Sequence, residues 1–599
     1  MLFFIYFMNG YWKNRIVSSK FYIGEIPHFR KHIKILKIAV TLILLFIVLR
    51  TAQIQLYKGK DFGNILNSTN ISTYYTKAIR GEILDRNGVV LAKDYPSFSL
   101  YIPNRREFEY KNIAVLSNLT GKSAKRIRKI LKVSTKNILI KRDLTREQVI
   151  QLELNRIDIK GIDIKVEPQR FYPMGNLYAH LIGYVSEVSR QNRESGYYQK
   201  YDYSGKTGIE KMFDKTLRGK DGIKKVAVNG MGEIIKTLEN MPAKNGSSLI
   251  LSVDSRLQKI VVESMRGKKG AVVIIRPDTG AILAMYSNPS YDPNQFVTGF
   301  TKVFWNKIKK NTDKPLINRA VKTYPPGSIF KVVTAAAALE NHVINSTTKI
   351  FSPPQIKVAN QVYHDWKKGG FGLINIHRAI ASSSDVFFYK LGLMTGASKI
   401  RRMALKFGLD RNLFKLIGSQ SGLIPSPAWK WRRFHKKWYA GNTISMAIGQ
   451  GYVRISPLQA AVVTAVIANG GYFIKPHILI KKEIKRIKII GNRTIKIIRS
   501  GMHDAVNSSI GTAFASRSNM IVIAGKTGTA QIIRTISRDK KNLHIPKKFI
   551  PDAWFISFAP YKHPKFAMAV FIENGGFGGA AAAPVAKRIY DQSVKAGII

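Results

Sequence analysis

The sequence predicts an α+β protein with an N-terminal transmembrane helix and more than one folded domain. Three observations support this: an uncharged apolar run at 38–49, strand-like segments with turn signals at both ends of the second half, and long apolar helical segments between them. The chain has 599 residues, of which 45% are hydrophobic, so it can bury more than one core. Strands at both ends with helices between them favour an antiparallel sheet flanked by helices.

The apolar run is a candidate membrane anchor. It reads IAVTLILLFIVL, and its apolar character continues past Arg50 to Leu56. A cleaved signal peptide is disfavoured because no small-x-small site follows the run, and its all-round hydrophobicity disfavours a buried helix. We therefore expect one retained span at 38–56.

Charge predicts the orientation of this span. Residues 1–37 carry many Lys and Arg residues and one acid, Glu25, so the positive-inside rule makes them a cytoplasmic tail. Everything after the span is then expected in the periplasm, and the anchor in the inner (cytoplasmic) membrane.

The whole chain is strongly basic, with 97 Lys and Arg residues against 36 Asp and Glu residues, a net charge of +61. The basic residues are spread over the whole length, with no basic arm, so we expect no nucleic-acid partner. There is no cysteine, which excludes disulfides and thiolate metal sites.

The stretch 57–247 is predicted to be a scaffold. Arg80 to Ala92 has the pattern of two strands joined by an Asn87–Gly88 turn, and we expect helices at Ser123–Leu131 and Thr145–Leu154. No acid/base groups gather here at a catalytic spacing.

A different composition begins near residue 248. The hydrophobic pattern predicts a hairpin at Ala271–Met285, around the turn Pro277-Asp278-Thr279-Gly280. It also predicts helices at Leu251–Met265, Ile329–Glu340, Pro457–Asn469 and Ala580–Lys595, strands at Ile521–Ala524, Trp554–Ala559 and Phe566–Glu573, and a loop at Ile532–Lys548.

Ser328 and Lys331 form a Ser-x-x-Lys pair on a predicted helix, where residues three apart share a face. Ser328 follows Pro-Pro-Gly at the helix N-terminus, where backbone N–H groups favour a developing oxyanion. Apolar neighbours desolvate Lys331, which favours the neutral amine that can accept a proton. The pattern also occurs at Ser346/Lys349 and Ser537/Lys540, but both lie in polar segments whose lysines would be solvated.

Two further motifs follow in order. Ser383-Ser384-Asp385 precedes an apolar helix, and Lys526-Thr527-Gly528-Thr529 closes a strand-like run, where one cation and two hydroxyls suit a carboxylate. Ser-x-x-Lys, Ser-Asp-Asn and Lys-Thr-Gly together are a known signature of serine enzymes that react with penicillin. A second Lys-Thr-Gly begins at Lys206, but it precedes the nucleophile and opens a helix, so we expect it to be structural.

At this point the chain resembles the class B penicillin-binding proteins of cell elongation over essentially its whole length. Matching stretches include RGEILDRNGVVLA, YPPGSIFK, HDWKKGGFG, SDVFFYKLG, RFHKKWYAGNT and GKTGTAQ. The resemblance implies a transmembrane anchor, an elongated pedestal (dimerisation-type) domain at 57–247, and a transpeptidase domain at 248–599 with a five-stranded antiparallel sheet.

The resemblance also implies residue roles in peptidoglycan D,D-transpeptidation. Ser328 would attack the penultimate D-Ala of a pentapeptide stem, with Lys331 as base, Ser383 as proton relay and Asp385 holding the network. Lys526, Thr527, Gly528 and Thr529 would bind the substrate carboxylate. The backbone N–H groups of Ser328 and Thr529 would form the oxyanion hole. Many relatives have Asn where this chain has Asp385.

Partners follow from the same resemblance. They are peptidoglycan pentapeptide stems, lipid-linked nascent glycan, β-lactams as covalent inhibitors, and a SEDS-type membrane glycan polymerase, since 57–247 is too short to hold a glycosyltransferase as well. Some relatives bind zinc through a Cys at the centre of the second motif. That position is Ser384 here, so we expect no metal and no cofactor.

Other classes fit less well. A β-lactamase would not need a pedestal, and a β-lactam sensor would need several spans. A scaffold with a degenerate transpeptidase is disfavoured by the intact motifs, although a scaffolding role can coexist with catalysis.

Overall fold

The computed structural model describes residues 27–57, 70–189, 191, 198–228, 234–300, 302–414, 416, 418–480, 483–530 and 549–599. The chain divides into two units. The first comprises Met1–Tyr75 with Ile223–Pro242, and the second comprises Thr76–Gly222 with Ala243–Ile599.

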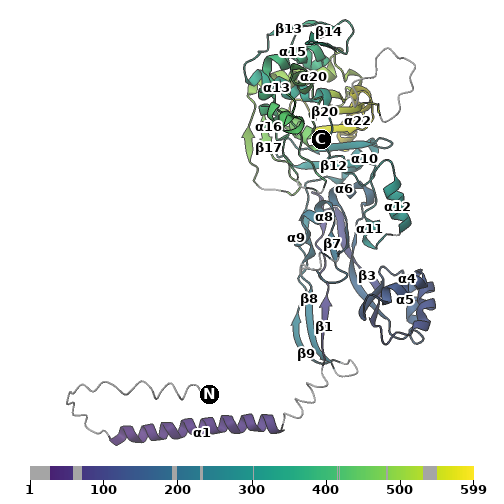
Figure 1. The fold of residues 1–599 in the computed structure, drawn as a ribbon, viewed down its shortest axis with the longest axis vertical. Helices are drawn as coiled ribbons and strands as arrows, with labels where there is room; N and C mark the ends of the chain where they lie inside the picture. Colours follow the sequence, from purple (N-terminus) through teal and green to yellow (C-terminus); the bar gives the residue numbers. More distant parts are fainter. Residues whose placement is uncertain are drawn as a thin grey trace, which may run out of the picture. The chain divides into compact units, whose positions relative to one another are not determined.

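The first unit contains helix α1 (Pro27–Tyr57), drawn in purple in Figure 1. Within α1, Lys34–Ile54 is long and apolar enough to cross a membrane, with a mean hydropathy of 2.3. It is the one helix of this kind in the described part of the chain. The unit also holds a sheet of three strands in the order β1 (Asn70–Thr76), β8 (Gly222–Val228) and β9 (Ile234–Met241).

The N-terminal part of the second unit is built on a long, bent strand. Strand β3 (Val90–Asn104) pairs antiparallel with β2 (Ile83–Leu84), β4 (Lys136–Lys141) and β5 (Asp163–Phe171). Gly88 at φ 82° makes the predicted β2–β3 turn, because its backbone conformation favours glycine. Short elements complete this part: β6 (Val185–Glu187), β7 (Tyr203–Gly205), α6 (Ala179–Ile182), α8 (Gly208–Met212) and α9 (Asp214–Arg218).

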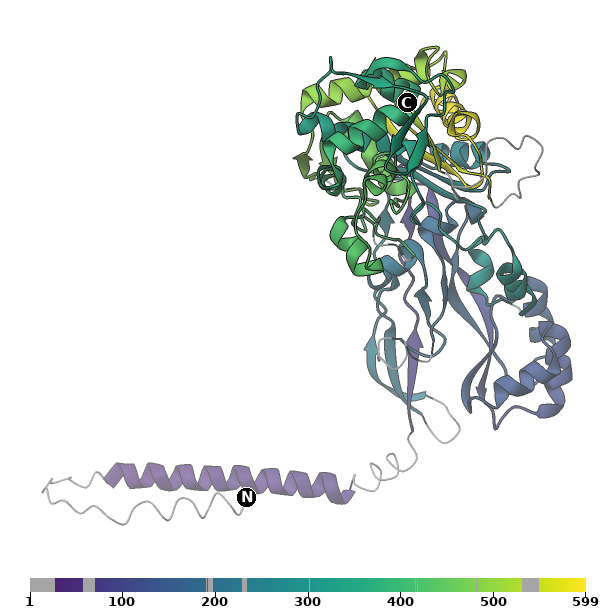
Figure 2. The same ribbon diagram turned by 45° about the horizontal axis from the view of Figure 1, so that its top comes forward.

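A small helical lobe packs on the far end of β3 and is seen in Figure 2 as the blue helices beside the strands. It contains α3 (Ile113–Thr120), α4 (Ala124–Leu131) and α5 (Arg146–Leu154). The predicted helices at 123–131 and 145–154 are therefore present. Each begins one residue later than predicted because Ser123 and Thr145 occupy the N-cap positions, and Thr145 forms a capping box with Gln148.

The C-terminal part of the second unit contains the predicted five-stranded antiparallel sheet. The strand order is β12 (Ile282–Asn288), β11 (Gly270–Ile275), β21 (Phe566–Ile572), β20 (Asp552–Ala559) and β19 (Ala524–Ala530). Its two faces bury alternate side chains of each strand. Val273 and Phe571 belong to one cluster, whereas Val272 and Val570 belong to the other.

Helices cover both faces of this sheet. α10 (Ser255–Ser264) and α22 (Ala583–Lys595) lie on one face, with α21 (Gly578–Ala581) preceding α22. The other face carries α13 (Lys331–Glu340) and α19 (Pro457–Ala468). The remaining helices are α11 (Asn294–Val297), α12 (Lys302–Lys310), α14 (Ile376–Ser382), α15 (Asp385–Thr395), α16 (Ala397–Lys406), α17 (Pro427–Phe434), α18 (Ala440–Ala447) and α20 (Asn492–Asn507).

Three two-stranded ribbons complete the domain. They pair β13 (Lys349–Ser352) with β16 (Gly372–Asn375), β14 (Gln355–Val358) with β15 (Gln361–His364), and β17 (Tyr472–Ile474) with β18 (Arg486–Lys488).

The predicted strand at Ile521–Ala524 was misplaced. The strand begins at Ala524 and contains the Lys526 motif itself, because residues 524–530 pair with β20 throughout. Gly525 and Gly528 permit this pairing, since a Cβ at Gly525 would lie 2.4 Å from the Phe555 ring.

Two predicted helices also begin later than expected. α10 begins at Ser255, since Asp254 is its N-cap and Leu251 forms a bridge with Leu479. In the predicted helix 329–340, the first turn is a 3₁₀ helix, η3 (Gly327–Phe330), and α13 follows it. The predicted loop at Ile532–Lys548 lies outside the described residues.

Candidate active site

Ser328 lies in η3, a turn that is held from two sides. The Trp554 Nε1–H group donates a hydrogen bond to Pro325 O at 3.0 Å, and Gly327 N donates to Gly449 O at 3.0 Å. Ser328 is partly exposed, whereas the next two residues, Ile329 and Phe330, are buried. The hydroxyl is therefore carried on a rigid turn at the surface of the domain.

Lys331, at the start of α13, is fully buried. Its Nζ donates hydrogen bonds to Asp385 Oδ1 at 2.7 Å and to Ser383 O at 2.8 Å, and it lies 3.3 Å from Ser383 Oγ. The Lys331 Nζ atom also lies 5.5 Å from the centre of the Phe388 ring. The first and second predicted motifs thus meet through this side chain.

The second motif occupies the junction of two helices. Ser383 is the C-cap of α14 at φ 57°, and Ser384 is the N-cap of α15. A left-handed conformation is uncommon for a serine, and such strain is concentrated at functional sites. Here it reverses the chain between the helices at the point where the Ser383 hydroxyl contacts two lysines.

Lys526, on β19, is the second of these lysines. It is fully buried, and its Nζ donates to Ser383 Oγ at 2.7 Å and to Thr527 O at 3.0 Å. Burial lowers the pKa of Lys526 well below its usual range, and the nearby charge of Lys331 lowers it further, while Asp385 opposes the shift. A hydroxyl between two buried amines can pass a proton from one to the other.

The third motif also packs against the turn that carries Ser328. A Cβ added at Gly327 would lie 2.5 Å from Thr529 O, and one added at Gly528 would lie 2.9 Å from Pro326 O. Only glycine permits this approach, which brings the backbones of Ser328 and Thr529 together, as a two-donor oxyanion hole requires.

The structure adds Thr512, which sequence reasoning missed. Its Oγ1 lies 2.6 Å from Thr527 Oγ1, a distance at which the two hydroxyls hydrogen-bond and fix the Thr527 rotamer. Thr512 is 15 residues from its partner and belongs to no motif, so no sequence pattern marks it.

Asp365 is a second residue that sequence reasoning left unassigned. Its buried Oδ2 accepts hydrogen bonds from Ser384 Oγ at 2.8 Å and from Val386 N at 2.9 Å. Ser352 Oγ lies 2.8 Å from Ser384 Oγ and completes the cluster. In the sequence, the one indication of a role for Asp365 is that it lies in the stretch HDWKKGGFG, which matches the related proteins.

This cluster does not fit a zinc ion of the kind that some relatives bind. Its donors are one carboxylate and two hydroxyls, all already hydrogen-bonded to one another, whereas zinc prefers Cys and His ligands. Among the described residues there is no group of three or more His, Cys, Asp or Glu side chains suited to a metal.

The competing motifs lie elsewhere. Lys206 lies between β7 and α8, and its backbone N–H donates to Tyr184 O at 2.9 Å. The neighbouring β7 pairs with β6, outside the sheet that contains β19. Ser346 lies in a turn before β13. Ser537 and Lys540 lie outside the described residues.

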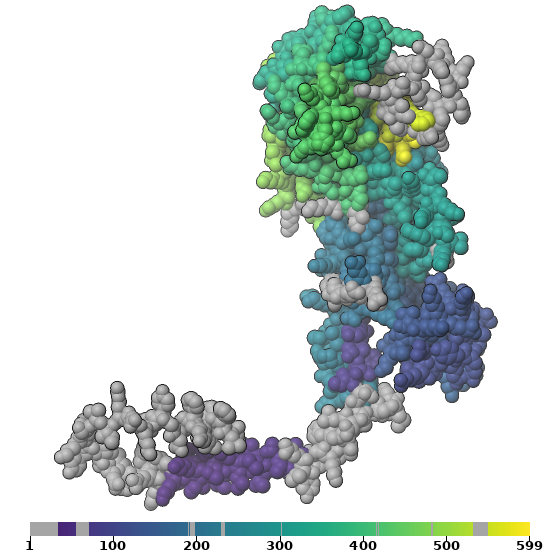
Figure 3. Space-filling model, viewed as in Figure 1, coloured from purple at the N-terminus to yellow at the C-terminus, as the bar shows by residue number. Residues whose placement is uncertain are grey.

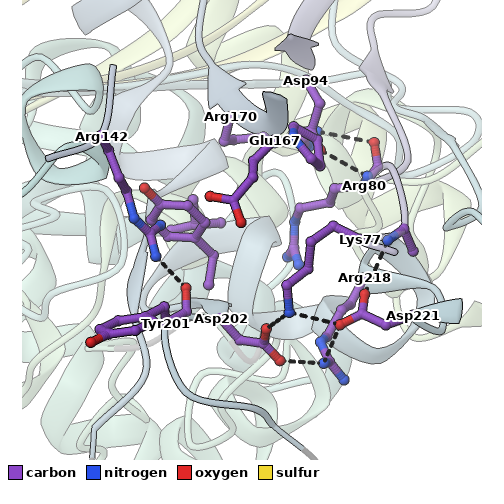
Figure 4. A pocket seen from close by; sticks show the side chains of 14 residues that line it. Lys77, Arg80, Asp94, Arg142, Glu167, Arg170, Tyr201, Asp202, Arg218 and Asp221 are labelled. Carbon is purple, nitrogen blue, oxygen red and sulfur yellow. Dashed lines mark hydrogen bonds and ion pairs between the residues drawn. The ribbon is translucent and has the colours of Figure 1, made fainter. Parts of the chain in front are cut away.

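The structure also contains a charged cavity of about 70 Å³ near β3 and β5, shown in Figure 4. Lys77 pairs there with Asp221 at 2.9 Å and with Asp202, while Arg170 pairs with Asp94 at 3.3 Å. Asp94, Asp202 and Asp221 pair with these cations, and Glu167 accepts hydrogen bonds from the Tyr101 hydroxyl at 3.0 Å, so the cavity has the character of a structural ion-pair cluster.

Comparison with known proteins agrees with the geometry. Residues 270–591 match the penicillin-binding protein transpeptidase domain, and residues 75–251 match the penicillin-binding protein dimerisation domain. The chain is 33% identical to a peptidoglycan D,D-transpeptidase MrdA of Acinetobacter baumannii over 581 residues, covering 92% of this chain and 86% of the relative. It is 30% identical to the MrdA of Escherichia coli K12 over 597 residues, covering 94% of each.

Solved structures give the same result. A complex between penicillin-binding protein PBP2 and MreC from Helicobacter pylori contains a chain with a TM-score of 0.80 and 29% identity. The match covers 88% of this chain and all of the H. pylori chain.

Proposed function

This chain belongs to the penicillin-binding proteins with a transpeptidase domain and is a peptidoglycan D,D-transpeptidase, and we propose that Ser328 is its nucleophile. The supporting observation is the convergence of three separate motifs: Lys331 and Lys526 both hydrogen-bond to the Ser383 hydroxyl, next to the turn that carries Ser328. β-Lactams, which mimic the D-Ala-D-Ala end of a stem, would acylate the same hydroxyl.

In the proposed acylation, Ser328 Oγ attacks the carbonyl carbon of the penultimate D-Ala. Its proton passes to the neutral form of Lys331, and the carbonyl oxygen becomes an oxyanion held by the backbone N–H groups of Ser328 and Thr529. When the peptide bond breaks, Ser383 relays a proton to the departing D-Ala nitrogen, and an ester to Ser328 remains.

Deacylation by an amine completes the cross-link. The amine of a neighbouring stem attacks the ester, loses a proton to the same network and releases Ser328. Water as the acceptor would give carboxypeptidation instead.

The carboxylate of the terminal D-Ala needs a cationic, hydrogen-bonding site. We assign this role to Lys526, Thr527, Gly528 and Thr529 on β19. A bare glycine within the strand leaves room for the substrate backbone, and the Thr512 contact holds the Thr527 hydroxyl ready to donate.

We propose that residues 57–247 form the pedestal and 248–599 the transpeptidase domain, with α1 as a single-pass anchor in the inner membrane and residues 1–37 as a cytoplasmic tail. Residues 75–251 and 270–591 match the dimerisation and transpeptidase domains, and we propose that a SEDS-type membrane polymerase supplies the glycan strands during cell elongation. An MreC-like protein is a further candidate partner, by analogy with the H. pylori complex.

Intact-mass measurement of the full chain in detergent tests the nucleophile. Incubation with penicillin is expected to add one adduct, on the peptide that contains Ser328. The Ser328→Ala variant is expected to remain unmodified, whereas the Ser346→Ala control is modified like the wild type. An adduct that persists in Ser328→Ala would refute the assignment.

A further inference from the structure

Two basic, aromatic segments lie outside the catalytic motifs. One is Trp366-Lys367-Lys368, after β15, and the other runs from Trp431 to Tyr439, at the end of α17. Every residue from Trp431 to Lys437 is exposed, with Trp431 at 53%, Phe434 at 42% and Tyr439 at 62%. Solvent-exposed Trp and Phe side chains grouped with cations mark an interaction surface.

We call these residues the basic aromatic surface. Its members are Trp366, Lys367, Lys368, Trp431, Arg432, Arg433, Phe434, Lys436, Lys437 and Tyr439. Figure 3 shows the green region that includes the second segment on the outer face of the transpeptidase domain.

The first segment touches the second catalytic motif. Trp366 is 49% exposed, yet its Nε1–H group donates a hydrogen bond to Ser382 O at 3.1 Å. Ser382 immediately precedes Ser383, so a molecule lying on the Trp366 ring also lies beside the proposed proton relay.

Helix α18 connects the second segment to the turn that carries Ser328. Tyr439 is the N-cap of α18, and Gly449, just beyond the end of that helix, accepts the hydrogen bond from Gly327 N. At 1.5 Å per residue, α18 spans about 12 Å. Strand β15, which precedes the first segment, approaches the start of α18, which follows the second, since a Cβ at Gly441 would lie 2.5 Å from the Tyr363 hydroxyl.

The sequence around the two segments contains few acidic residues that could pair with their cations. There is no Asp or Glu between Asp410 and Glu483, and Asp365, the one acid in 353–372, is buried and hydrogen-bonded. None of the ion pairs among the described residues involves the cations of this surface: Lys367, Lys368, Arg432, Arg433, Lys436 and Lys437. These charges are available to an anionic partner.

We propose that the basic aromatic surface binds the glycan strand of the substrate and the acidic side chains of its stem peptides. This inference rests on the proposed function. Sugar rings pack their C–H faces on exposed aromatic rings, and the free carboxylates of a stem pair with Arg and Lys. The enzyme would thereby recognise polymeric substrate beyond the D-Ala-D-Ala end, a region that a β-lactam lacks.

The test compares two variants of the full chain that lose the same charge. The surface variant is R432Q/R433Q/K436Q/K437Q. The control is K302Q/K307Q/K309Q/K310Q on α12, whose four lysines are equally exposed. We expect the surface variant to bind purified peptidoglycan at least about tenfold more weakly, since four exposed charge contacts each contribute a severalfold factor. The control should bind like the wild type. Added salt should reduce the difference in peptidoglycan binding between the surface variant and the wild type.

Penicillin acylation separates this inference from the proposed function. The inference is supported if both variants are acylated within about twofold of the wild-type rate and only the surface variant loses peptidoglycan binding. Equal binding by both variants overturns it. The inference is also overturned if the surface variant binds anionic phospholipid vesicles more weakly but binds peptidoglycan like the wild type. That result would show that the surface binds the membrane. Failure of wild-type acylation at Ser328 would refute the proposed function itself.

Discussion

Asp365 Oδ2 accepts a hydrogen bond from Ser384 Oγ at 2.8 Å, across the junction that holds Ser383 between the two lysines. Asp365 also accepts from Val386 N in the first turn of α15, where the helix dipole favours a negative charge. The buried carboxylate therefore ties the second motif to the β15 side of the domain without touching the reacting atoms.

Removing this carboxylate should loosen the motif. Asp365→Ala leaves buried donors on Ser384 and Val386 without an acceptor, which costs about 2–4 kcal/mol in the free energy of unfolding. We expect a lower unfolding temperature and penicillin acylation slowed by about tenfold or more, measured with a fluorescent penicillin.

Ser352→Ala is the matched control, because it removes one member of the cluster and leaves the Asp365–Ser384 contact in place. Its acylation rate should stay within about threefold of wild type. Acylation by Asp365→Ala at the wild-type rate would show that the contact does not position Ser383.

The duplicated Lys-Thr-Gly provides a second test. Lys526→Ala removes a hydrogen bond to Ser383 and the proposed cation for the substrate carboxylate. Acylation should slow by about 10²-fold or more, as expected for a lost charge-assisted contact. Lys206→Ala should acylate at the wild-type rate. Stopped-flow acylation of both variants measures the contrast, and the reverse pattern would mean that the other copy binds substrate.

Asp385 should control the pH dependence of acylation. Its charge raises the pKa of Lys526, opposing burial and Lys331, and it pairs with Lys331 at 2.7 Å. Asp385→Asn removes a group that stabilises protonated lysine, so the pKa of Lys526 should fall further. Because Lys526 is the proposed cation for the substrate carboxylate, the loss of acylation at high pH should then move to lower pH in this variant.

Acylation rates from pH 6 to 10 measure this shift, with wild type and Asp385→Asn in the same buffers. Parallel profiles with a small offset would contradict an electrostatic role and leave Asp385 as a hydrogen-bond acceptor that Asn can replace. A shift to higher pH would contradict the sign of the proposed interaction.

Glu210 should contribute strongly to folding. Burial by itself raises the pKa of its carboxyl, but Arg170 and Arg80, at 2.7 and 2.6 Å, outweigh burial and lower the pKa below its usual range. Glu210→Gln leaves two buried guanidinium groups short of a counter-charge, which costs about 3 kcal/mol.

Thermal unfolding measures this loss, and the pH dependence has a definite sign. Because the folded-state pKa is depressed, the stabilisation by Glu210 is present above the ordinary pKa of 4.5 and is lost as pH falls through the folded value. The difference between wild type and Glu210→Gln should therefore shrink in acid. Glu239→Gln, which breaks the exposed pair with Lys225, should leave the unfolding temperature close to that of the wild type.

Thr512 should act on substrate through Thr527. Thr512→Val keeps the shape of the side chain but removes the hydroxyl at 2.6 Å from Thr527 Oγ1. We expect acylation to slow by about three- to tenfold, about the effect of one hydrogen bond. Thr347→Val, which removes an exposed hydroxyl in a surface turn, should have no effect. An equal effect of both substitutions would exclude a specific role for Thr512.

Sequence patterns are sufficient to predict the features that depend on near neighbours in the chain. The membrane helix follows from an unbroken apolar run, and the turn at Gly88 and the caps at Ser123 and Thr145 follow from local backbone chemistry. The order and context of the three motifs also predict Ser328, and not Ser346, as the nucleophile.

Which side chains meet depends on how distant elements pack in the folded chain. Lys331 and Lys526 are 52 and 143 residues from Ser383, and their amines reach one hydroxyl because α13, the α14–α15 junction and β19 pack around the same sheet edge. No local sequence pattern predicts the contacts of Asp365 and Thr512, or the surface around Trp366. The periodicity of hydrophobic residues predicts which face of a helix or strand is buried. Which residues pack against that face depends on how elements distant in the sequence come together.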